Sequence, residues 1–315
     1  MKVVITGIGS VTSLGATVSS FWSSLLQGKS GISRVPIDLP SGPSFRLISE
    51  PKIGSSELFE HNDTPGLRYA YLAGTEAISN AKAQPSELNL LIDSCVSSPA
   101  DFGFPKVLKD LLRIPNCEQK FSPLGNLDSA CSAIARVQSG LYEKVLLIGV
   151  SHSVSSYFYE KILPMGILNT QDLGDPEGAI KCFDKNSRGT VLGEGATAIL
   201  FESEESAIKR NCNVIARVEN FCRNSDAGFL LRPSEQGKGL IKANQVALKD
   251  TKVDLVVADG AAISERDYSE AYAIESSANF AYVTSVKGYV GHLLGALGPT
   301  QLAAGALCIE NVRSK

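Results

Sequence analysis

A single cysteine lies among small residues in the stretch Asp128-Ser129-Ala130-Cys131-Ser132-Ala133-Ile134. Residues 121–128 favour an extended segment and Cys131–Leu141 favours a helix, so the cysteine is predicted to begin that helix. The N-terminus of a helix stabilises an anion, and a thiol there can have its pKa lowered from about 8.5 to about 6.5. We therefore predict that Cys131 is the reactive thiol, whereas the other six cysteines are core residues.

Strand-like and helix-like stretches alternate on both sides of this cysteine. The predicted strands are Val3–Thr6, Leu88–Val96, Lys144–Val150, Ala196–Glu202, Val214–Phe221, Val253–Ala258 and Tyr282–Thr284. The other predicted helices are Val18–Leu26, Leu67–Ala81, Lys106–Leu112, Gly239–Lys249, Tyr268–Ser277 and Leu293–Ile309. Residues 30–60 are rich in Ser, Pro and Gly and are predicted to be irregular. The alternation is typical of the α/β class, and a charged stretch at 206–213 separates the predicted parts 1–208 and 209–315.

The composition excludes several classes of protein. The chain has 315 residues, 43% of them hydrophobic, and 30 Lys+Arg against 33 Asp+Glu give a net charge of −3. Disorder needs lower hydrophobicity and higher net charge. No Lys/Arg-rich run occurs, which argues against a nucleic-acid partner. No apolar run approaches the ~18 residues of a membrane helix, so no membrane partner is expected.

The cysteines and histidines limit the possible chemistry. The seven cysteines are odd in number and scattered, and none forms a CxxC pair. This usage fits reduced thiols better than a disulfide framework or a zinc site. The N-terminal stretch lacks the apolar core of a signal peptide. We therefore expect a cytoplasmic location, with no metal and no cofactor. The three histidines are His61, His152 and His292.

A glycine-containing stretch follows the first predicted strand, in Gly7-Ile8-Gly9-Ser10-Val11-Thr12. A strand, then glycines, then a helix suggests a dinucleotide-binding oxidoreductase. That fingerprint needs a third glycine at the position of Thr12 and an acidic residue that closes a following strand. Both are missing, so the glycines are predicted to serve a tight turn.

Two further stretches combine charged residues with glycines. One is a glycine-punctuated loop at 183–196 that leads into a strand. The other is Lys287-Gly288-Tyr289-Val290-Gly291-His292-Leu293-Leu294-Gly295-Ala296-Leu297-Gly298. A lone histidine is more often structural than catalytic. His292, however, follows a glycine at a predicted helix start, five residues after Lys287, which makes both side chains candidates for a functional site.

These four stretches, in this order, resemble the β-ketoacyl-acyl-carrier-protein synthases of fatty-acid and polyketide assembly. The matching residues are Val4–Gly9, Phe21–Trp22, Gly28–Ile32, Ala130–Ser132, Phe183–Gly195, Asp226–Ala227, Asp267, Glu270–Ala271 and Lys287–Gly298. The resemblance implies an α/β fold of the thiolase type, in which two βαβαβ halves stack in five α-β-α-β-α layers.

The resemblance also implies a reaction and its residues. In such enzymes the nucleophile, here Cys131, takes an acyl group from an acyl carrier protein. A malonyl thioester then loses carbon dioxide, and the resulting carbanion attacks the acyl-cysteine. His292 matches one of two active-site histidines, Lys287 supports the charge network, and Asp267 with Glu270 lies in the accompanying helix. The implied assembly is a homodimer or a heterodimer with another ketosynthase, paired through the segment at 121–128.

Two departures from the family pattern concern catalysis. Asp259 stands where the family has its other histidine, and an ionised carboxylate cannot donate a hydrogen bond to a developing enolate. If Asp259 lies beside His292, pairing would keep Asp259 ionised and hold His292 as the imidazolium. The sequence given also stops at Lys315, before the two strands and glycine-rich turn that close the family, so the C-terminal half is expected to be truncated. Losing one oxyanion donor typically costs ~10²–10³ in rate.

Two functions therefore stay open. The first is a condensing acyltransferase acting through Cys131. The alternative is a catalytically impaired partner subunit, similar to the chain-length factors that pair with active synthases. The presence of Cys131 favours the enzyme, whereas Asp259 favours the partner. Acyl transfer to Cys131 does not need the replaced histidine, so we expect it to be easier than condensation.

Overall fold

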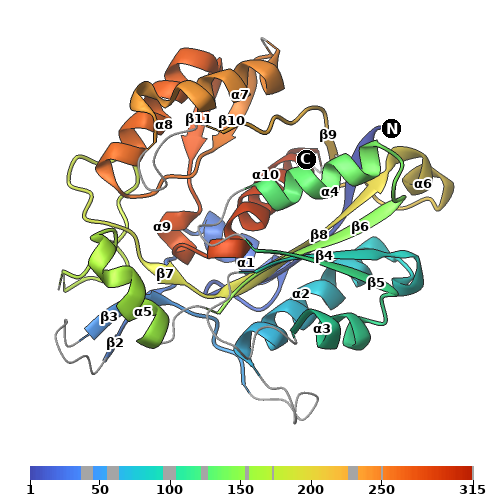
Figure 1. The fold of residues 1–315 in the computed structure, drawn as a ribbon, viewed down its shortest axis with the longest axis horizontal. Coiled ribbons are helices and arrows are strands. Elements are labelled where there is room, and N and C mark those ends of the chain that lie inside the picture. Colours follow the sequence, from blue (N-terminus) through green and yellow to red (C-terminus); the bar gives the residue numbers. More distant parts are fainter. Residues whose placement is uncertain are drawn as a thin grey trace.

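The computed structural model of the protein describes residues 1–36, 45–54, 64–94, 104–121, 127–152, 156–171, 174–225, 233–249 and 251–313. Its largest sheet has six strands in the order β5-β4-β6-β8-β1-β9 (Figure 1). The strands are β1 (Val3–Val11), β4 (Asn89–Ser94), β5 (Asn116–Phe121), β6 (Lys144–Ser151), β8 (Gly195–Ser203) and β9 (Ala216–Val218). The pairs of β4 with β5 and β6 are parallel, and the pairs β6–β8, β8–β1 and β1–β9 are antiparallel.

Helices cover both faces of this sheet (Figure 1). They are α2 (Pro65–Ala81) and α3 (Phe104–Leu112) on one face, and α4 (Asp128–Gln138) and α10 (Leu297–Arg313) on the other. Alternate residues of β6 enter two hydrophobic clusters: Val145 and Leu147 pack on the α4 side, and Leu146 and Ile148 on the α2 side. A strand that is buried on both faces has an apolar residue at nearly every position, which explains the continuous apolar run seen in the sequence.

The glycines of the first motif serve helix packing. Gly7 and Gly9 lie inside β1, where a Cβ atom on Gly9 would lie 1.9 Å from the carbonyl oxygen of Ala73 on α2. Only a residue without a side chain lets α2 approach β1 this closely. The prediction of a tight turn at these glycines is wrong, because β1 continues through them to Val11.

A smaller parallel sheet lies beyond α10. It consists of β10 (Val253–Val257) and β11 (Phe280–Thr284), which α8 (Ser264–Ser277) connects. Together with α7 (Lys238–Leu248), α8 forms the outermost layer, and α10 packs against β10 from the inner side (Figure 1). The layers alternate helix, sheet, helix, sheet, helix, which confirms the predicted α-β-α-β-α stack.

A third sheet contradicts the prediction that residues 30–60 are irregular. Its strands are β2 (Ile32–Pro36), β3 (Phe45–Ser49) and β7 (Leu192–Gly193). Ile32, Phe45 and Leu47 enter a hydrophobic cluster with Val191, and this burial outweighs the turn preference of the Ser and Pro residues nearby. Because β7 also bridges His292, this sheet supports the candidate site.

The remaining helices are α1 (Val18–Leu26), α5 (Ser156–Ile162), α6 (Glu204–Lys209) and α9 (Lys287–Val290). The helix α1 has its predicted bounds, and the Thr17 side chain caps it by accepting a hydrogen bond from the Ser20 amide. The predicted helix Leu293–Ile309 begins instead as a 3₁₀ turn at Leu294–Ala296 and continues as α10. At this turn Gly295 packs on strand backbone, where a Cβ atom would lie 2.8 Å from the Asp93 carbonyl oxygen.

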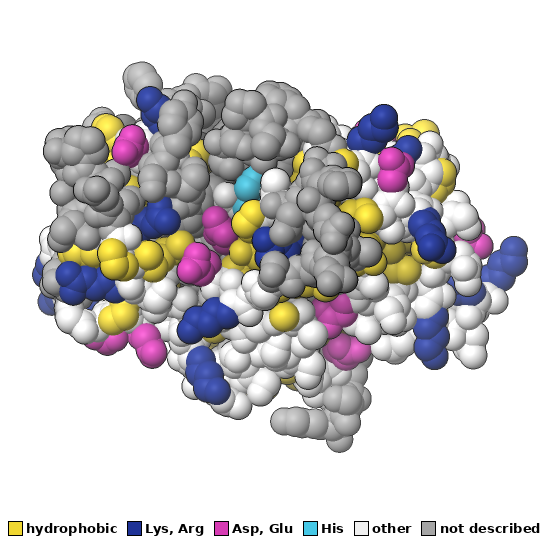
Figure 2. Space-filling view, turned by 90° about the horizontal axis from the view of Figure 1, so that it is seen from below, with side chains coloured by type: hydrophobic (Ala, Val, Ile, Leu, Met, Phe, Trp, Pro, Cys, Tyr) yellow, Lys and Arg dark blue, Asp and Glu magenta, His cyan; other side chains and the backbone are white. Residues whose placement is uncertain are grey.

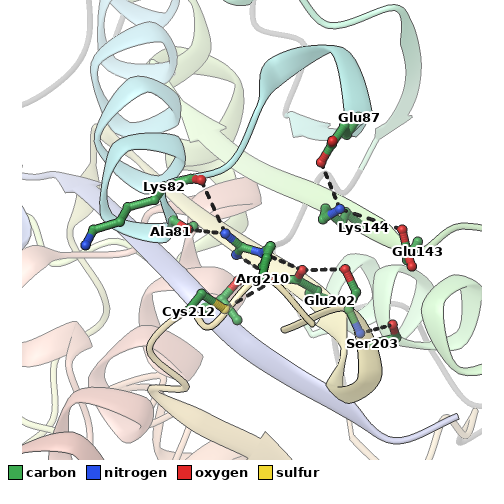
Figure 3. A network of polar contacts seen from close by, with 11 residues as sticks. Ala81, Lys82, Glu87, Glu143, Lys144, Glu202, Ser203, Arg210 and Cys212 are labelled. Carbon is green, nitrogen blue, oxygen red and sulfur yellow. Dashed lines mark hydrogen bonds and ion pairs between the residues drawn. The ribbon is translucent and has the colours of Figure 1, made fainter. Parts of the chain in front are cut away.

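A buried ion pair links β8 to the loop after α6 (Figure 3). The Glu202 side chain is fully buried, and its two oxygens accept hydrogen bonds from Arg210 Nε and Nη2, each at 2.7 Å. Ser206 donates to Oε1 at 2.7 Å, and Thr6, at a bulge in β1, donates to Oε2 at 3.0 Å. Arg210 also donates to the carbonyl oxygen of Ala81 at the end of α2. The pair therefore joins β1, β8 and α2 at one point.

The surface seen from below carries a mixture of charges. Figure 2 shows Lys and Arg side chains spread over the described part of this face, with Asp and Glu between them. A phosphate-binding surface gathers positive charge on one face, and this face does not have that pattern. In the described ranges, no helix is both long and apolar enough to cross a membrane.

Candidate active site

A buried lysine holds the carboxylate of Asp259. Lys287 Nζ donates to Asp259 Oδ1 at 2.8 Å, and the Lys287 side chain is 0% exposed while that of Asp259 is 44% exposed. Burial raises the pKa of Asp259, but the charge and the hydrogen bond of Lys287 outweigh it and hold that pKa below its usual value. Asp259 is therefore ionised at neutral pH, and Lys287 is its counter-ion.

The turn that carries Asp259 is fastened from several elements. Glu270 on α8 accepts hydrogen bonds from the amides of Asp259 at 2.7 Å and Gly260 at 2.9 Å. The Ser285 hydroxyl donates to the Asp259 carbonyl oxygen at 3.0 Å, and Gln301 on α10 donates to the carbonyl oxygen of the preceding residue at 2.9 Å. Burial, with the Asp259 charge, raises the pKa of Glu270 to about 7. The backbone of the Asp259 turn is thus fixed by α8, α10 and the segment before α9.

Asp267 fastens the glycine-punctuated loop to the same helix. It is 4% exposed, and its Oδ2 atom accepts a hydrogen bond from the Phe183 amide at 2.7 Å. Burial raises the pKa of Asp267, and the backbone hydrogen bond from Phe183 opposes that effect. Asp267 and Glu270 therefore lie in the helix that the resemblance implied, and both contact backbone rather than Lys287 directly.

His292 is held as a neutral imidazole. Its amide donates to the Val191 carbonyl oxygen at 2.7 Å, and its carbonyl oxygen accepts from the Gly193 amide at 3.0 Å. The Leu294 amide donates to Nδ1 at 3.1 Å, which requires Nδ1 to be unprotonated and places the proton on Nε2. Burial and the Lys287 charge lower the pKa of His292 to about 3. His292 can thus donate one hydrogen bond from Nε2.

The expected imidazolium at His292 is therefore wrong. That expectation assumed that Asp259 pairs with His292, but the carboxylate of Asp259 takes its hydrogen bond from Lys287. With that lysine buried beside it, a second positive charge on His292 is disfavoured. The expectation that Asp259 is ionised agrees with the direction of its pKa shift.

Cys131 lies one turn inside its helix rather than at its start. The helix α4 begins at Asp128, and the Cys131 amide donates within the helix to the Leu127 carbonyl oxygen at 2.9 Å. Burial and the Asp128 carboxylate raise the pKa of Cys131, while Arg223 lowers it. The predicted lowering of this pKa is wrong, because the thiol is partly buried and the Asp128 carboxylate occupies the first turn of the helix.

Cys131 and the group of Asp259, Lys287 and His292 lie on different elements that share one hydrophobic core. No hydrogen bond or ion pair in the described part of the chain joins Cys131 to Asp259, Lys287 or His292. The elements that carry them do share a core, since Ala130 on α4 packs in one hydrophobic cluster with Leu293. The structure thus brings Asp259, Lys287 and His292 together and packs the Cys131 helix against α10, the helix that follows the His292 segment.

A second cysteine, which the sequence did not single out, lies under the Asp259 turn. The Cys182 thiol donates to the Gly260 carbonyl oxygen at 3.1 Å, and burial raises its pKa. Cys182 and Ser285 line a pocket of about 860 Å³. The rest of its lining is Gly28, Ser30, Glu177, Ile180, Lys181, Phe183, Asp184, Ala271, Ile274, Glu275, Phe280, Val283, Thr284, Gly288 and Tyr289. No sequence motif marks Cys182, because its role depends on a turn 78 residues away.

In the ranges that the structure describes, no group of three or more His, Cys, Asp and Glu side chains is arranged to hold a metal ion. His61 and Cys95, together with Asp226 and Ala227 of the matching motifs, lie outside the described residues.

The five-layer α-β-α-β-α stack defines the thiolase-like class of folds. The chain belongs to the β-ketoacyl synthase family: residues 1–91 match the model "Beta-ketoacyl synthase, N-terminal domain" and residues 215–313 match "Beta-ketoacyl synthase, C-terminal domain". It is 26% identical to 3-oxoacyl-(acyl-carrier-protein) synthase 2 of Synechocystis sp., over 98% of this chain and 85% of that protein.

Solved structures share the fold. One is a type II PKS acyl-carrier protein in complex with its ketosynthase bound to the hexaketide, with a TM-score of 0.84 and 20% identity. Another is the ishigamide ketosynthase/chain length factor, with a TM-score of 0.83 and 22% identity. Each match covers 98% of this chain and 86% of the solved chain.

The charges around Cys131 predict how its reactivity responds to substitution. Asp128→Asn should speed alkylation of Cys131 at mildly alkaline pH, because removing the carboxylate lowers the pKa of the thiol. Arg223→Ala should slow it, because the guanidinium lowers that pKa in the native protein. Timed iodoacetamide labelling, read by peptide mass, measures both rates, with Cys308 as an internal reference. A change of the labelling rate in the same direction in both variants would contradict the opposite effects that we assign to Asp128 and Arg223.

Proposed function

We propose that this chain is a ketosynthase-type acyltransferase of fatty-acid or polyketide biosynthesis, which takes an acyl group from an acyl carrier protein onto Cys131. The Cys131 sulfur attacks the carrier thioester, a new C–S bond forms, and the carrier thiol leaves with the proton of the cysteine. The family match at both ends of the chain and the small residues around Cys131 support this step.

The Asp259–Lys287 ion pair is the observation that limits the second half of the reaction. When a malonyl thioester loses carbon dioxide, negative charge develops on its carbonyl oxygen. His292 can donate to that oxygen from Nε2 because its Nδ1 is occupied by the Leu294 amide. Asp259, where the family has a second donor, is an ionised acceptor and repels the charge. We therefore propose that acyl transfer is faster than condensation.

A second candidate function rests on the same ion pair. A chain that binds acyl groups but condenses poorly would serve as the partner subunit of an active ketosynthase, in the manner of a chain-length factor. Asp259 favours this candidate, and Cys131 favours the enzyme. Adding an active ketosynthase from the same cell to the assays below separates the two candidates.

Acyl loading tests the proposal. After incubation with an acyl-carrier thioester, the intact protein should gain the mass of one acyl group, and peptide mass should place it on Cys131. Cys131→Ala should abolish the adduct because the nucleophile is gone, whereas Cys308→Ser, which changes a half-buried thiol on α10, should leave it unchanged. An adduct that persists in Cys131→Ala would contradict the proposed nucleophile.

The open edge of β5 predicts dimerisation. In the described residues β5 is the edge strand of the large sheet, and an unpaired edge is a template for another strand. It lies directly before the segment that pairs across the two-fold axis in the family, and residues 122–126 of that segment lie outside the described residues. We expect a dimer, with itself or with another ketosynthase, in light scattering at micromolar concentration. A stable, soluble monomer would contradict this expectation.

The division into parts 1–208 and 209–315 remains our proposal. The family models fall on either side of that boundary. The parts are not separate cores, because β9 pairs with β1 and α10 packs on the large sheet.

A further inference from the structure

An ion pair fixes the segment after β9 against the first turn of the nucleophile helix. Arg223 pairs with Asp128, the first residue of α4. Phe221, two residues earlier, packs against the large hydrophobic cluster to which Ala130 also belongs. Arg223 therefore holds this segment to the N-terminal end of α4, and Phe221 holds it to the hydrophobic core.

This anchoring brings a second thiol to Cys131. Asp128 and Cys131 are three residues apart in α4, so their side chains lie on the same face of the helix. Cys222 stands between the two anchored residues, Phe221 and Arg223. Its charge is one of the smaller causes that raise the pKa of Cys131, which agrees with this placement of Cys222 beside α4. Both cysteines are free thiols and both are half-buried, so small reagents can reach them.

We propose that Cys131 and Cys222 form a reversible disulfide when the protein meets a peroxide. This modification site uses no residue of the Asp259–Lys287–His292 group. It depends on the Asp128–Arg223 pair, which holds the two segments together.

The chemistry balances with hydrogen peroxide as the oxidant. The Cys131 sulfur attacks one peroxide oxygen, the O–O bond breaks, and a sulfenic acid and one water form. The Cys222 sulfur then attacks the Cys131 sulfur, the S–O bond breaks, and a second water leaves. The two thiols together lose two electrons and two hydrogens, and the peroxide is reduced to two waters. A dithiol reductant reverses the reaction through thiol–disulfide exchange.

The disulfide would block the proposed acyl loading, because the Cys131 sulfur is then bonded to Cys222 and is no longer a nucleophile. Only this consequence rests on the proposed function, whereas the disulfide itself does not. A protein that forms the disulfide but never accepts an acyl group would remove the proposed function and leave the modification site in place.

The test treats the full-length protein with a small excess of hydrogen peroxide, blocks remaining thiols with N-ethylmaleimide, and maps peptides without reduction. We expect one linked pair, Cys131 with Cys222, the loss of two hydrogens in the intact mass, and the loss of acyl loading until dithiothreitol is added. Non-reducing electrophoresis should show the link within one chain.

Three variants make the result specific. In Cys222→Ser, Cys131 should stop at the sulfenic acid or oxidise further, and no linked pair should form. Cys308→Ser should behave as the wild type. Arg223→Ala should slow formation of the link, because the segment loses one of its two anchors. A link from Cys131 to any other cysteine, or oxidation of Cys131 that proceeds identically with and without Cys222, would overturn the proposal.

Discussion

Asp259→His should raise the rate of malonyl decarboxylation by roughly 10²-fold, the usual worth of one oxyanion donor. A neutral imidazole can donate to the developing enolate oxygen, whereas the native carboxylate repels it. The substitution also removes the counter-ion of the buried Lys287. Glu270 can take over that role, because the Asp259 charge is one cause of its raised pKa and is absent in the variant.

Carbon dioxide release from a malonyl-carrier substrate measures this effect. Asp259→Asn is the matched control. It removes the negative charge, and its side-chain amide can donate but is shorter than the imidazole of Asp259→His. Its rate should therefore lie between those of the wild type and Asp259→His. Asp254→His changes an exposed acid on β10, the strand that precedes the Asp259 turn, and should have no effect. Thermal unfolding of each variant separates catalysis from folding. A rate in Asp259→His equal to that of the wild type, with the fold intact, would show that the carboxylate is not what limits decarboxylation.

Glu202→Ala should have the largest effect on stability, with a loss of about 3–5 kcal/mol in the free energy of unfolding. Glu202 is fully buried and Arg210 is 20% exposed, so the variant leaves a mostly buried guanidinium without its carboxylate. Thr6 and Ser206 also lose their acceptor. Urea unfolding, followed by circular dichroism, measures the loss.

Two comparisons identify the cause. Glu143→Ala removes an exposed partner of Lys144 in the same region (Figure 3) and should cost about 0–1 kcal/mol. The double variant with Glu202→Leu and Arg210→Met should recover much of the loss, because it replaces both charges by apolar groups. A double variant no more stable than Glu202→Ala would contradict the unpaired-charge explanation.

The same pair predicts a dependence on pH. Burial raises the pKa of Glu202, but the hydrogen bonds from Arg210 and Ser206 outweigh it, so the pKa is lower in the folded protein than in the unfolded chain. A group with such a lowered pKa stabilises the fold at pH values above the ordinary pKa of glutamate. This contribution is lost as the pH falls through the pKa of the group in the folded protein. As the pH is lowered in the acidic range, the free energy of unfolding should therefore fall less steeply in Glu202→Ala than in the wild type.

The layers of the fold could be predicted because their signal is local. The central strands are buried on both faces, so their apolar runs stand out, and α1 has a capping residue at Thr17 that marks its start. Strands β2 and β3 could not be predicted in this way. Their apolar residues bury against Val191, which is more than 140 residues away in the chain.

The sequence could predict that the side chains of Asp259, Lys287 and His292 lie together, but it could not predict their charge states. The motifs bring Asp259, Lys287 and His292 together as expected. The ionisation of His292 depends on which side chain Lys287 pairs with, and on the Leu294 amide at Nδ1. The pKa of Cys131 depends on where α4 begins, and a shift of three residues puts Asp128 into the first turn. Such details are set by tertiary packing rather than by spacing.

The most direct test of the central claim measures both half-reactions of the wild type in one sample. The protein is given an acyl-carrier thioester and a malonyl-carrier thioester, with intact mass reporting the acyl group on Cys131 and gas release reporting decarboxylation. The Asp259–Lys287 pair predicts a loaded Cys131 together with carbon dioxide release roughly 10²-fold slower than that of the Asp259→His variant. Rapid release by the wild type that is abolished in Asp259→Asn would show that the carboxylate is a working catalytic group, and would contradict the account.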